Sequence, residues 1–365
     1  MSQEPTVCFF QAYNRDYIRT ETLLQGLQEN GVPVILCQAN RKSPLRYPIA
    51  LWRFLRGVGK CDVVLANFRS FETLWLLRLL TRKPILHDAH ISFWQSACEE
   101  RGWFRPDSLP GRFLFFLDRV NCRRLSDHVL IDTEAHRDYF VRTFNVPPER
   151  ITSVYISCED KLFFPRPKPP KGSSTTTVFW SGTGIPLQGL DVLYEACKEL
   201  QKRGADVVLR LAGWSGIIER LKRTAESEGV RNIVFLGSIP RRQVIEEIAA
   251  ADIGLGGHYS TIPKAAQVIA GKVYELIAMK KPVIVGDSPA TRELFVDGET
   301  ALLCRMGSAP SLADAVETLA GDPALGKRLA ENAHALYQSR LRPQVDVLPL
   351  LPVLRRLAGM TDSRD

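Results

Sequence analysis

Residues 177–189 read Thr177-Val178-Phe179-Trp180-Ser181-Gly182-Thr183-Gly184-Ile185-Pro186-Leu187-Gln188-Gly189. The apolar start of this stretch predicts a buried strand, and the amphipathic segment 190–203 that follows it predicts a helix. The glycines between them allow a tight turn whose backbone amides can approach an anion, and the start of the helix adds positive potential. The stretch therefore predicts a diphosphate-binding loop after a strand; a plain tight turn is the alternative.

The alternation of strands and helices continues on both sides of this stretch. Further strands are predicted at residues 7–10, 34–37, 62–66, 84–90, 127–132, 207–212, 233–236, 252–256 and 282–285, with helices between most of them. Such alternation is typical of parallel sheets that helices cover on both faces. The predicted fold class is α/β, with two Rossmann-like doubly wound domains facing each other across a cleft at the carboxyl ends of their sheets.

A run of prolines marks the predicted domain boundary. The stretch from Pro165 to Ser174 is polar, and its prolines prevent regular strand pairing. We therefore predict an N-terminal domain at residues 1–165, a linker at 166–176 and a C-terminal domain at 177–340. The tail at 341–365 has Leu and Val at helical spacing, and we expect it to cross back onto the N-terminal domain.

Composition narrows the class of partner and the compartment. The 365 residues carry 48 Lys and Arg against 40 Asp and Glu, a net charge of +8 that favours phosphates, nucleotides or anionic lipid headgroups as partners. The eight cysteines are scattered without a Cys-x-x-Cys pair, which argues against a zinc site and a disulfide framework. Without a signal peptide or a membrane-spanning run in the sequence, we expect a cytoplasmic protein with reduced thiols.

A second stretch, from Lys272 to Val285, predicts a short helix, a turn and a buried strand. Glu275 lies in the first turn of that helix, where the helix dipole favours a carboxylate, and it can accept two hydroxyl groups of a ribose. An acidic residue that only stabilises the helix start is the alternative. No Walker-type motif occurs, and the Gly-rich turn does not fit Gly-x-Gly-x-x-Gly, so ATP hydrolysis and dinucleotide binding are not expected.

Several motifs stand in order along the C-terminal half. They are Pro186-Leu187-Gln188-Gly189, Tyr274-Glu275, Ala278-Met279-Lys280-Lys281-Pro282-Val283-Ile284, and Arg292-Glu293-Leu294 followed by Asp297 to Leu303. In this order they resemble the donor domain of family 4 (group 1) glycosyltransferases over residues 178–340, whereas the N-terminal half matches only in outline. The resemblance implies the GT-B fold and a nucleoside-diphosphate sugar as co-substrate, with no other cofactor. It also implies transfer with retention of configuration to a glycan or lipid-linked acceptor, in cell-surface polysaccharide or glycoconjugate synthesis.

The resemblance also assigns a donor site, from which this sequence departs. The family's paired glutamate falls at Gln267, its loop arginine at Thr183 and its loop lysine at Gln188, so the cationic diphosphate ligands are neutral here. Lys272, Lys264 or Arg19 is the candidate for the missing charge. The predicted donor-binding residues are Gly182, Thr183, Gly184, Gln188, Lys264, Gln267, Lys272, Val273 and Glu275.

Two polar segments follow strands of the N-terminal half. The resemblance predicts that His90 contacts the transferred sugar, with Asp88 beside it as the second catalytic residue. A buried structural histidine is the alternative, and His87 could face the cleft instead. Arg15 and Arg19, after the first strand, are predicted to bind an anionic acceptor such as a lipid diphosphate; an ordinary solvated loop is the alternative.

Basic and aromatic residues interleave in two further stretches, Leu51 to Lys60 and Gly111 to Arg124. Such helices can lie on an anionic bilayer, so contact with the inner face of the membrane is a hypothesis; core helices with basic outer faces are the alternative. Neither nucleic acid nor a metal ion is expected as a partner, because no module or ligand cluster for them is recognisable. A nucleotide-sugar epimerase of the same fold and a non-catalytic sugar-nucleotide-binding subunit are the rival functions.

Overall fold

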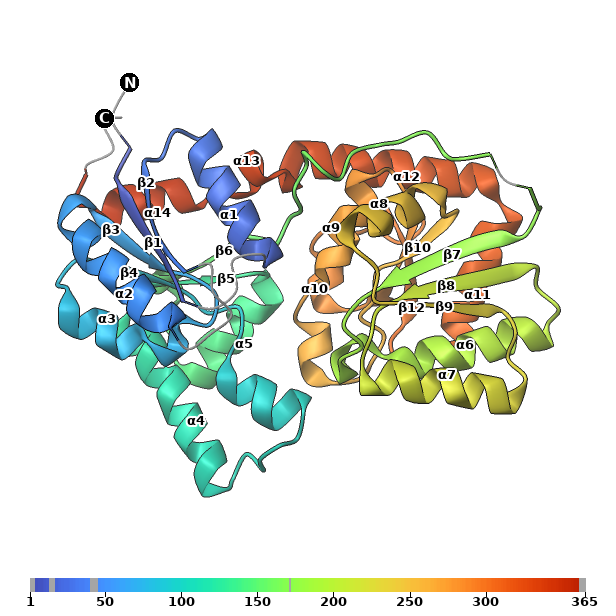
Figure 1. Ribbon diagram of the computed structural model, residues 1–365, viewed down its shortest axis with the longest axis horizontal. Helices are drawn as coiled ribbons and strands as arrows, with labels where there is room; N and C mark the ends of the chain where they lie inside the picture. The colour runs from blue at the N-terminus through green and yellow to red at the C-terminus, as the bar shows by residue number, and fades with distance from the viewer. Residues whose placement is uncertain (1–3, 13–16, 40–44, 171, 361–365) are drawn as a thin grey trace. The chain divides into compact units, whose positions relative to one another are not determined.

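The computed structural model describes residues 4–12, 17–39, 45–170 and 172–360, and the chain forms two compact units (Figure 1). The first unit comprises residues 1–157 and 342–365, and the second comprises residues 158–341. Each unit contains one parallel sheet with helices on both faces, so the predicted α/β class with two doubly wound units is confirmed.

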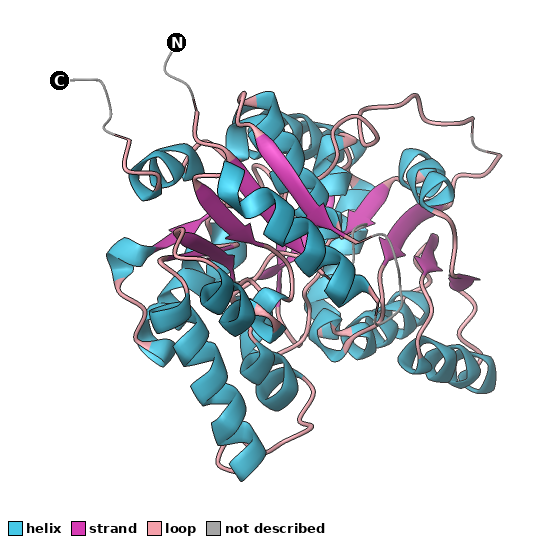
Figure 2. Cartoon of the chain, turned by 60° about the vertical axis from the view of Figure 1, so that its left-hand side comes forward, coloured by secondary structure: helices cyan, strands magenta, loops and turns pink. Residues whose placement is uncertain are grey.

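The N-terminal unit is built on a six-stranded parallel sheet in the order β2-β1-β3-β4-β5-β6. Its strands are β1 (Val7–Gln11), β2 (Val34–Gln38), β3 (Val63–Ala66), β4 (Ile85–Asp88), β5 (His128–Ile131) and β6 (Ile151–Ser153). Its helices are α1 (Ile18–Glu29), α2 (Arg46–Gly57), α3 (Leu74–Leu80), α4 (Leu109–Val120), α5 (Glu134–Phe144), α13 (Pro343–Asp346) and α14 (Leu350–Leu357). The four central strands are buried along their whole length, as expected when helices cover both faces of a sheet (Figure 2).

Residues after Arg342 complete the core of this N-terminal unit. Val347, Leu350 and Leu354 pack in one buried cluster with Val7 and Phe9 of β1. The approach is close, because a Cβ added at Gly26 of α1 would lie 2.3 Å from the carbonyl oxygen of Pro343. The boundary between the units lies at residues 157 and 158, not in the predicted linker at 166–176, because Cys158 packs against Tyr337 of the C-terminal unit.

The C-terminal unit has its own six-stranded parallel sheet, in the order β12-β11-β10-β7-β8-β9. Its strands are β7 (Thr176–Ser181), β8 (Val207–Ala212), β9 (Ile233–Gly237), β10 (Ile253–Leu255), β11 (Val283–Asp287) and β12 (Leu302–Arg305). Its helices are α6 (Leu190–Lys202), α7 (Gly216–Glu228), α8 (Arg241–Ala250), α9 (Gly271–Ala278), α10 (Pro289–Arg292), α11 (Ala309–Gly321) and α12 (Pro323–Leu336). The sequence predicted most of these elements but missed the edge strands β6 and β12, which are short and pair on one side only.

The strand order fixes where a ligand can bind in each unit. Counted within the C-terminal unit, its strands lie in the order 3-2-1-4-5-6, so the direction of winding reverses between β7 and β10. In the N-terminal unit the reversal lies between β1 and β3. Doubly wound sheets bind ligands beyond the carboxyl ends of the strands at such a reversal, because the flanking loops diverge there.

Candidate functional site

The loop after β7 is held tightly by its own residues. The amide of Gly184 donates to Oε1 of Gln188 over 2.9 Å, and the amide of Gly182 donates to the carbonyl of Ala212 over 3.0 Å. A Cβ at Gly182 would lie 2.8 Å from the ring of Trp180, so the turn requires glycine there. These bonds correct the prediction that the amides of both glycines bind a diphosphate, since the protein already occupies them. Gln188 uses only its Oε1 here, and binding of a diphosphate by its side chain stays a prediction. Thr183 and Pro186 are the exposed members of the loop.

The loops after β7 and β10 are joined at the reversal of the sheet. The hydroxyl of Ser260 donates to the carbonyl of Leu187 over 2.9 Å. Gly189 has a φ of 67°, and a Cβ there would lie 2.5 Å from the amide nitrogen of Ser260. Gly189 therefore permits the close approach that fixes both loops beside the start of α9.

Lys272 is the charged residue at the start of α9. Its side chain is more than nine-tenths buried, and Nζ lies 3.9 Å from the centre of the Trp180 ring. Among the described residues, Nζ has no hydrogen-bond partner. Burial lowers the pKa of the Lys272 ammonium from 10.5 to about 7, against the smaller opposing effect of Glu275. A buried cation without a counter-charge is unfavourable by itself, so this position suits an anionic ligand.

Glu275 follows Lys272 by three residues and so lies on the same side of α9. Burial raises the pKa of its carboxyl from 4.5 to about 7, although Arg241 and Lys272 oppose that shift. Its carboxylate has no hydrogen bond or ion pair with any described side chain. A cation that lacks an anion and a carboxylate that lacks a donor thus stand about one helical turn apart. Lys272 lies beside the first peptide N–H groups of α9, whereas Glu275 lies in the second turn, so its predicted place in the first turn is wrong.

The remaining predicted donor-binding residues lie around this helix start in different roles. Val273 is fully buried and packs against Gly256, and its amide donates to Ala270, so its predicted role as a ligand is corrected to that of a core residue. Lys264 is buried in a short 3-10 turn, and the amide of Gln267 donates to its carbonyl over 3.0 Å. Both residues make a further interaction within the protein.

In the N-terminal unit, Asp88 at the end of β4 contacts two buried side chains, the guanidinium of Arg19 and the imidazole of His90. Its Oδ1 accepts from Nε of Arg19 over 2.9 Å, and its Oδ2 lies 3.1 Å from Nδ1 of His90. Burial alone would raise the pKa of the Asp88 carboxyl, but Arg19 and His90 outweigh that effect and hold the pKa at about 2. Asp88 is therefore ionised, and it orients the His90 ring.

His90 itself is covered by aromatic side chains. Its Nε2 lies 3.3 Å from the hydroxyl of Tyr17, and its ring stacks against Tyr17 and Phe68, which stack on each other with centroids 3.8 Å apart. The histidine is only 3% exposed. A sugar could contact Nε2 of His90 only if the Tyr17 hydroxyl moved away from it. The contact between His90 and the transferred sugar stays a prediction.

Arg19, which was predicted to lie at the acceptor site, lies in the interior of the N-terminal unit. The side chain is fully buried, and its guanidinium donates to Asp88 and to the carbonyls of Val154, Tyr155 and Ile131. This corrects the prediction that Arg19 binds an anionic acceptor or supplies the missing diphosphate charge, because its donors are used within the fold. Arg15 lies outside the described residues. His87 is buried in β4, where burial lowers its pKa to about 4, so it is a core residue.

Sequence reasoning missed a second buried pair beside the end of β5. Nδ1 of His136 lies 2.6 Å from Oδ1 of Asp132, and Nε2 lies 3.2 Å from Oε1 of Gln95. Burial alone would raise the pKa of the Asp132 carboxyl, but the neighbouring His136 outweighs that effect, so the pKa is lowered from its ordinary value. The signal for this pair was present in the sequence, because a carboxylate at the end of a strand and a histidine in the first turn of the following helix are only four residues apart.

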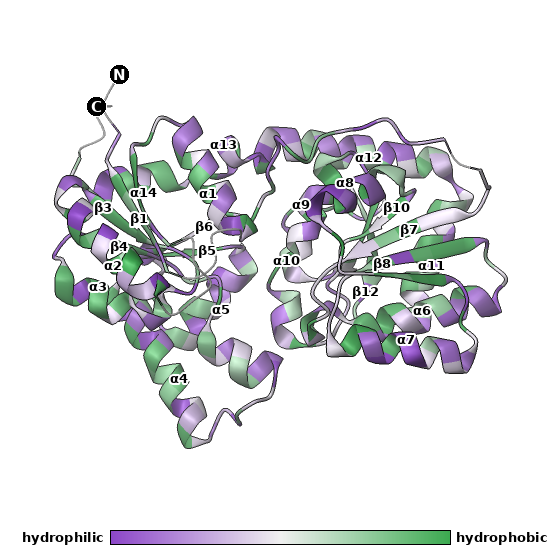
Figure 3. Cartoon of the chain, in the orientation of Figure 1, coloured by the Kyte–Doolittle hydropathy of each residue, from purple (hydrophilic) through white to green (hydrophobic). Residues whose placement is uncertain are grey.

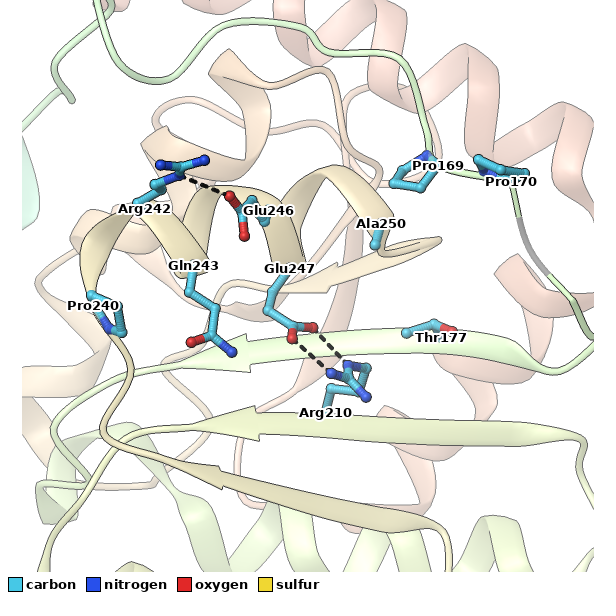
Figure 4. Close-up of a pocket in the computed structure, with 10 residues that line it drawn as sticks. All are labelled: Pro169, Pro170, Thr177, Arg210, Pro240, Arg242, Gln243, Glu246, Glu247 and Ala250. Carbon is cyan, nitrogen blue, oxygen red and sulfur yellow. Dashed lines mark hydrogen bonds and ion pairs between the residues drawn. The ribbon is translucent and has the colours of Figure 1, made fainter.

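A cavity of about 650 Å³ lies elsewhere in the C-terminal unit, between α8 and the strands β7 and β8 (Figure 4). Arg210 forms two hydrogen bonds of 2.6 Å with Glu247 on its wall, and Arg242 pairs with Glu246. Because these charges neutralise each other, the cavity offers less to a diphosphate than the start of α9 does.

Within the described ranges, metal-ligand groups and membrane-spanning helices are both absent. No three His, Cys, Asp or Glu side chains are grouped so as to hold a metal ion in the described ranges, and the expectation that none is required remains untested. No described helix has the length and hydrophobicity to cross a membrane.

The fold of the whole chain has known counterparts. Sucrose-phosphate synthase from Thermosynechococcus elongatus superimposes with a TM-score of 0.76 at 16% identity, covering 98% of this chain and 99% of that one. Together with the two doubly wound units and the polar residues at their reversals, this similarity defines a protein of the GT-B class.

Sequence comparison identifies the family. Residues 164–336 match the model for glycosyl transferases group 1, and residues 4–156 match the glycosyl transferase 4-like domain. The chain is 30% identical over 296 residues to a GDP-mannose-dependent alpha-(1-6)-phosphatidylinositol monomannoside mannosyltransferase of Mycolicibacterium smegmatis, covering 76% of this chain and 72% of the relative. It is 24% identical over 216 residues to alpha-D-kanosaminyltransferase of Streptomyces kanamyceticus, covering 57% of this chain and only 55% of that relative's length. The chain belongs to the group 1 glycosyltransferases, and the family resemblance is confirmed.

Proposed function

We propose that this protein transfers a sugar from a nucleoside-diphosphate sugar to a glycan or lipid-linked acceptor, with retention of the anomeric configuration. The observation that carries the donor part of the proposal is the buried ammonium of Lys272, which has no partner among the described residues and lies at the start of α9. A diphosphate would supply the missing counter-charge and would meet the positive end of the helix dipole as well.

Glu275 supports the nucleoside part of the donor. Its unpaired carboxylate can accept hydrogen bonds from two adjacent hydroxyl groups, which is the pattern that a ribose offers. The pKa of its carboxyl lies near 7, so a ligand that donates hydrogen bonds would favour the ionised form. Lys272 and Glu275 would thus hold the two chemically distinct parts of one nucleoside diphosphate.

The names of the relatives support transfer as the reaction. One relative is a mannosyltransferase that depends on GDP-mannose and acts on a phosphatidylinositol mannoside, and another is a kanosaminyltransferase. We infer from the first that a lipid-linked acceptor at the inner face of a membrane is the leading candidate here.

In the proposed reaction the bond between the anomeric carbon and the diphosphate oxygen breaks, and a bond from that carbon to the acceptor oxygen forms. The leaving diphosphate takes the proton of the acceptor hydroxyl, so no protein nucleophile is required. Lys272 would stabilise the charge that develops on the diphosphate, which is the largest contribution an enzyme of this type can make.

The neutral residues at two family positions are compatible with two alternative functions. Thr183 and Gln188 stand where the family has arginine and lysine, and Oε1 of Gln188 accepts from the amide of Gly184. A subunit that binds sugar nucleotides without catalysis, or an epimerase of the same fold, would also tolerate these changes. Consumption of the nucleotide sugar separates the three functions. A transferase consumes it only when an acceptor is present, an epimerase converts it without an acceptor, and a binding subunit does not convert it at all.

Thermal unfolding with a panel of nucleoside diphosphates and nucleotide sugars tests the donor site. A ligand at about 100 times its dissociation constant should stabilise the protein by roughly 2.7 kcal/mol. We expect a shift with one nucleotide class that Glu275→Ala removes, while Glu246→Ala, on the exposed side of α8, retains it. If every nucleotide leaves the unfolding temperature of the wild type unchanged, the nucleotide-sugar proposal fails.

A further inference from the structure

Helix α4 carries an apolar stripe on its solvent side. Leu109, Phe113 and Phe116 are 83%, 59% and 61% exposed, although large apolar side chains are normally buried. They are spaced by four and three residues, so they lie along one side of the helix. In Figures 1 and 2 α4 extends away from the N-terminal sheet, and Figure 3 shows apolar residues recurring along it.

The opposite side of α4 is fixed to the protein, so the stripe cannot turn inward. Gly111, Leu114 and Asp118 are the buried residues of the helix. The carboxylate of Asp118 accepts from the hydroxyl of Ser92 over 2.6 Å and from the amide of Trp94 over 2.9 Å. Burying the stripe by rotating the helix would break these bonds.

The loop before α4 extends the apolar surface. Trp103 and Phe104 are 63% and 40% exposed. A Cβ added at Gly111 of α4 would lie only 2.3 Å from the carbonyl oxygen of Arg105, so the loop packs closely against the helix. The amide of Trp103 also donates to the carbonyl of Ala97 over 2.8 Å. We call Trp103, Phe104, Leu109, Phe113 and Phe116 together the α4 patch.

Unpaired positive charge surrounds the α4 patch. The arginines of residues 109–125 are Arg112, Arg119, Arg123 and Arg124, and no ion pair involves any of them among the described residues. The one acidic residue of this span, Asp118, is buried and bonded to Ser92. The outer side of residues 109–125 therefore presents aromatic and aliphatic groups among positive charges, and the exposed Asp107 of the preceding loop is paired with Arg105.

Helix α2 offers a useful contrast. Trp52 and Leu55 are also exposed there, but Arg53 donates to the carbonyl of Gln38 and Arg56 lies over the Trp52 ring, 4.6 Å from its centre. Its basic groups are engaged within the protein. Beside the α4 patch, Arg101 and Arg105 of the loop are paired with Glu100 and Asp107, but the four arginines of residues 109–125 form no ion pair among the described residues. Of the two segments that the sequence singled out for membrane contact, the structure favours α4.

We propose that the α4 patch docks on an anionic lipid bilayer. Apolar and aromatic groups flanked by cations suit the boundary between headgroups and acyl chains, where the rings insert and the cations meet lipid phosphates. A protein partner for this surface would have to supply both an apolar socket and several carboxylates. The inference deepens the proposed function by naming the surface that brings the chain to a lipid-linked acceptor, but docking needs neither donor nor transfer.

Sedimentation with vesicles tests the proposal. The chain is mixed with vesicles of equal parts phosphatidylglycerol and phosphatidylcholine, or of phosphatidylcholine alone, and the bound fraction is measured. We expect binding to the anionic vesicles only, weakened at least tenfold as salt rises from about 0.1 M to about 1 M, because the Debye length falls from roughly 10 Å to 3 Å. The variant Leu109→Ser/Phe113→Ser/Phe116→Ser should lose at least tenfold in partitioning, and Arg112→Gln/Arg119→Gln should lose a comparable amount.

The controls separate docking from folding and from the proposed transfer. Substituting serine for exposed apolar residues elsewhere, at Val234, Val296 and Leu348, should leave vesicle binding unchanged. All variants should keep the unfolding temperature and the nucleotide-induced shift of the wild type, so a failure of docking is distinct from a failure of the donor site. Absence of binding to anionic vesicles, or full binding by the triple serine variant, overturns the proposal. A change of oligomeric state without vesicle binding would assign the patch to a protein interface and overturn it too.

Discussion

The guanidinium of Arg19 lies 2.9 Å from the carboxylate of Asp88, and both side chains are completely buried. Arg19 also donates to three backbone carbonyls at the ends of β5 and β6, and Asp88 holds the ring of His90. The pair therefore joins α1, β4 and the segments after β5 and β6 at the carboxyl edge of the N-terminal sheet. Its geometry indicates a structural support for the candidate site, not a ligand within it.

Removing the arginine of this pair should destabilise the protein strongly. Arg19→Gln leaves Asp88 ionised and buried without its main counter-charge, which typically costs about 3–5 kcal/mol. Urea denaturation should show this loss in the free energy of unfolding. The matched control is Arg242→Gln, whose side chain is 91% exposed and pairs with Glu246, and which should stay within about 0.5 kcal/mol of the wild type. Equal stability of the two variants would contradict the structural role of Arg19.

Lys272→Met should stabilise the free protein and weaken nucleotide binding. The variant removes a buried ammonium that has no counter-charge but keeps the side-chain length, so we expect a gain of about 1–3 kcal/mol at neutral pH. Binding of a nucleoside diphosphate, measured by calorimetry, should weaken roughly 10- to 100-fold, as expected for the loss of a charged hydrogen bond. A variant that is less stable and binds normally would count against a ligand-binding Lys272.

The same residue predicts a pH dependence of stability. The pKa of Lys272 is about 7 in the folded protein and 10.5 ordinarily, so between these values the unfolded chain binds a proton that the folded chain lacks. Stability attributable to Lys272 should therefore rise with pH in this window, by up to about 1.4 kcal/mol per pH unit. The difference between wild type and Lys272→Met isolates this effect, because Lys281, whose pKa burial lowers to about 8, is common to both proteins. Parallel pH profiles for the two proteins would be incompatible with the prediction.

Gly189→Ala should disrupt the junction of the two loops at the start of α9. An alanine there would combine a positive φ with a Cβ only 2.5 Å from the amide of Ser260, so we expect a loss of about 2–4 kcal/mol in thermal or urea unfolding. Gly204→Ala is the matched control, because Gly204 has a φ of 71° but open space around it. If Gly204→Ala lowers the free energy of unfolding as much as Gly189→Ala does, the close approach of Gly189 to Ser260 makes no contribution of its own.

His90→Asn tests the predicted contact with the transferred sugar. We expect kcat to fall roughly 10- to 100-fold, equivalent to about 1.4–2.7 kcal/mol in the barrier, while nucleotide affinity stays within about twofold of the wild type. His334→Asn, whose ring contacts the carbonyl of Ile277, controls for the loss of a histidine elsewhere. Unchanged kcat in His90→Asn would leave His90 with a purely structural role.

The sequence was sufficient to predict the architecture because the hydrophobic pattern is a local property. Strands such as β1 and β7 are apolar and bounded by turn residues, and Lys272 and Glu275 stand at a helix start that the pattern locates. The use of each polar group was not predictable, because it depends on partners far along the chain. Arg19 finds Asp88 at a separation of 69 residues, and no local pattern distinguishes such an arginine from a surface ligand.

The return of residues after Arg342 to the N-terminal sheet has a consequence for biosynthesis. The C-terminal unit is continuous in sequence, so all of its core has been made once residue 341 leaves the ribosome. The N-terminal unit begins to emerge first yet lacks Val347, Leu350 and Leu354 until nearly the end, which leaves the apolar side of β1 and α1 uncovered during translation. The half that is made first is therefore the half that matures last, and in that interval it is the part most in need of a chaperone.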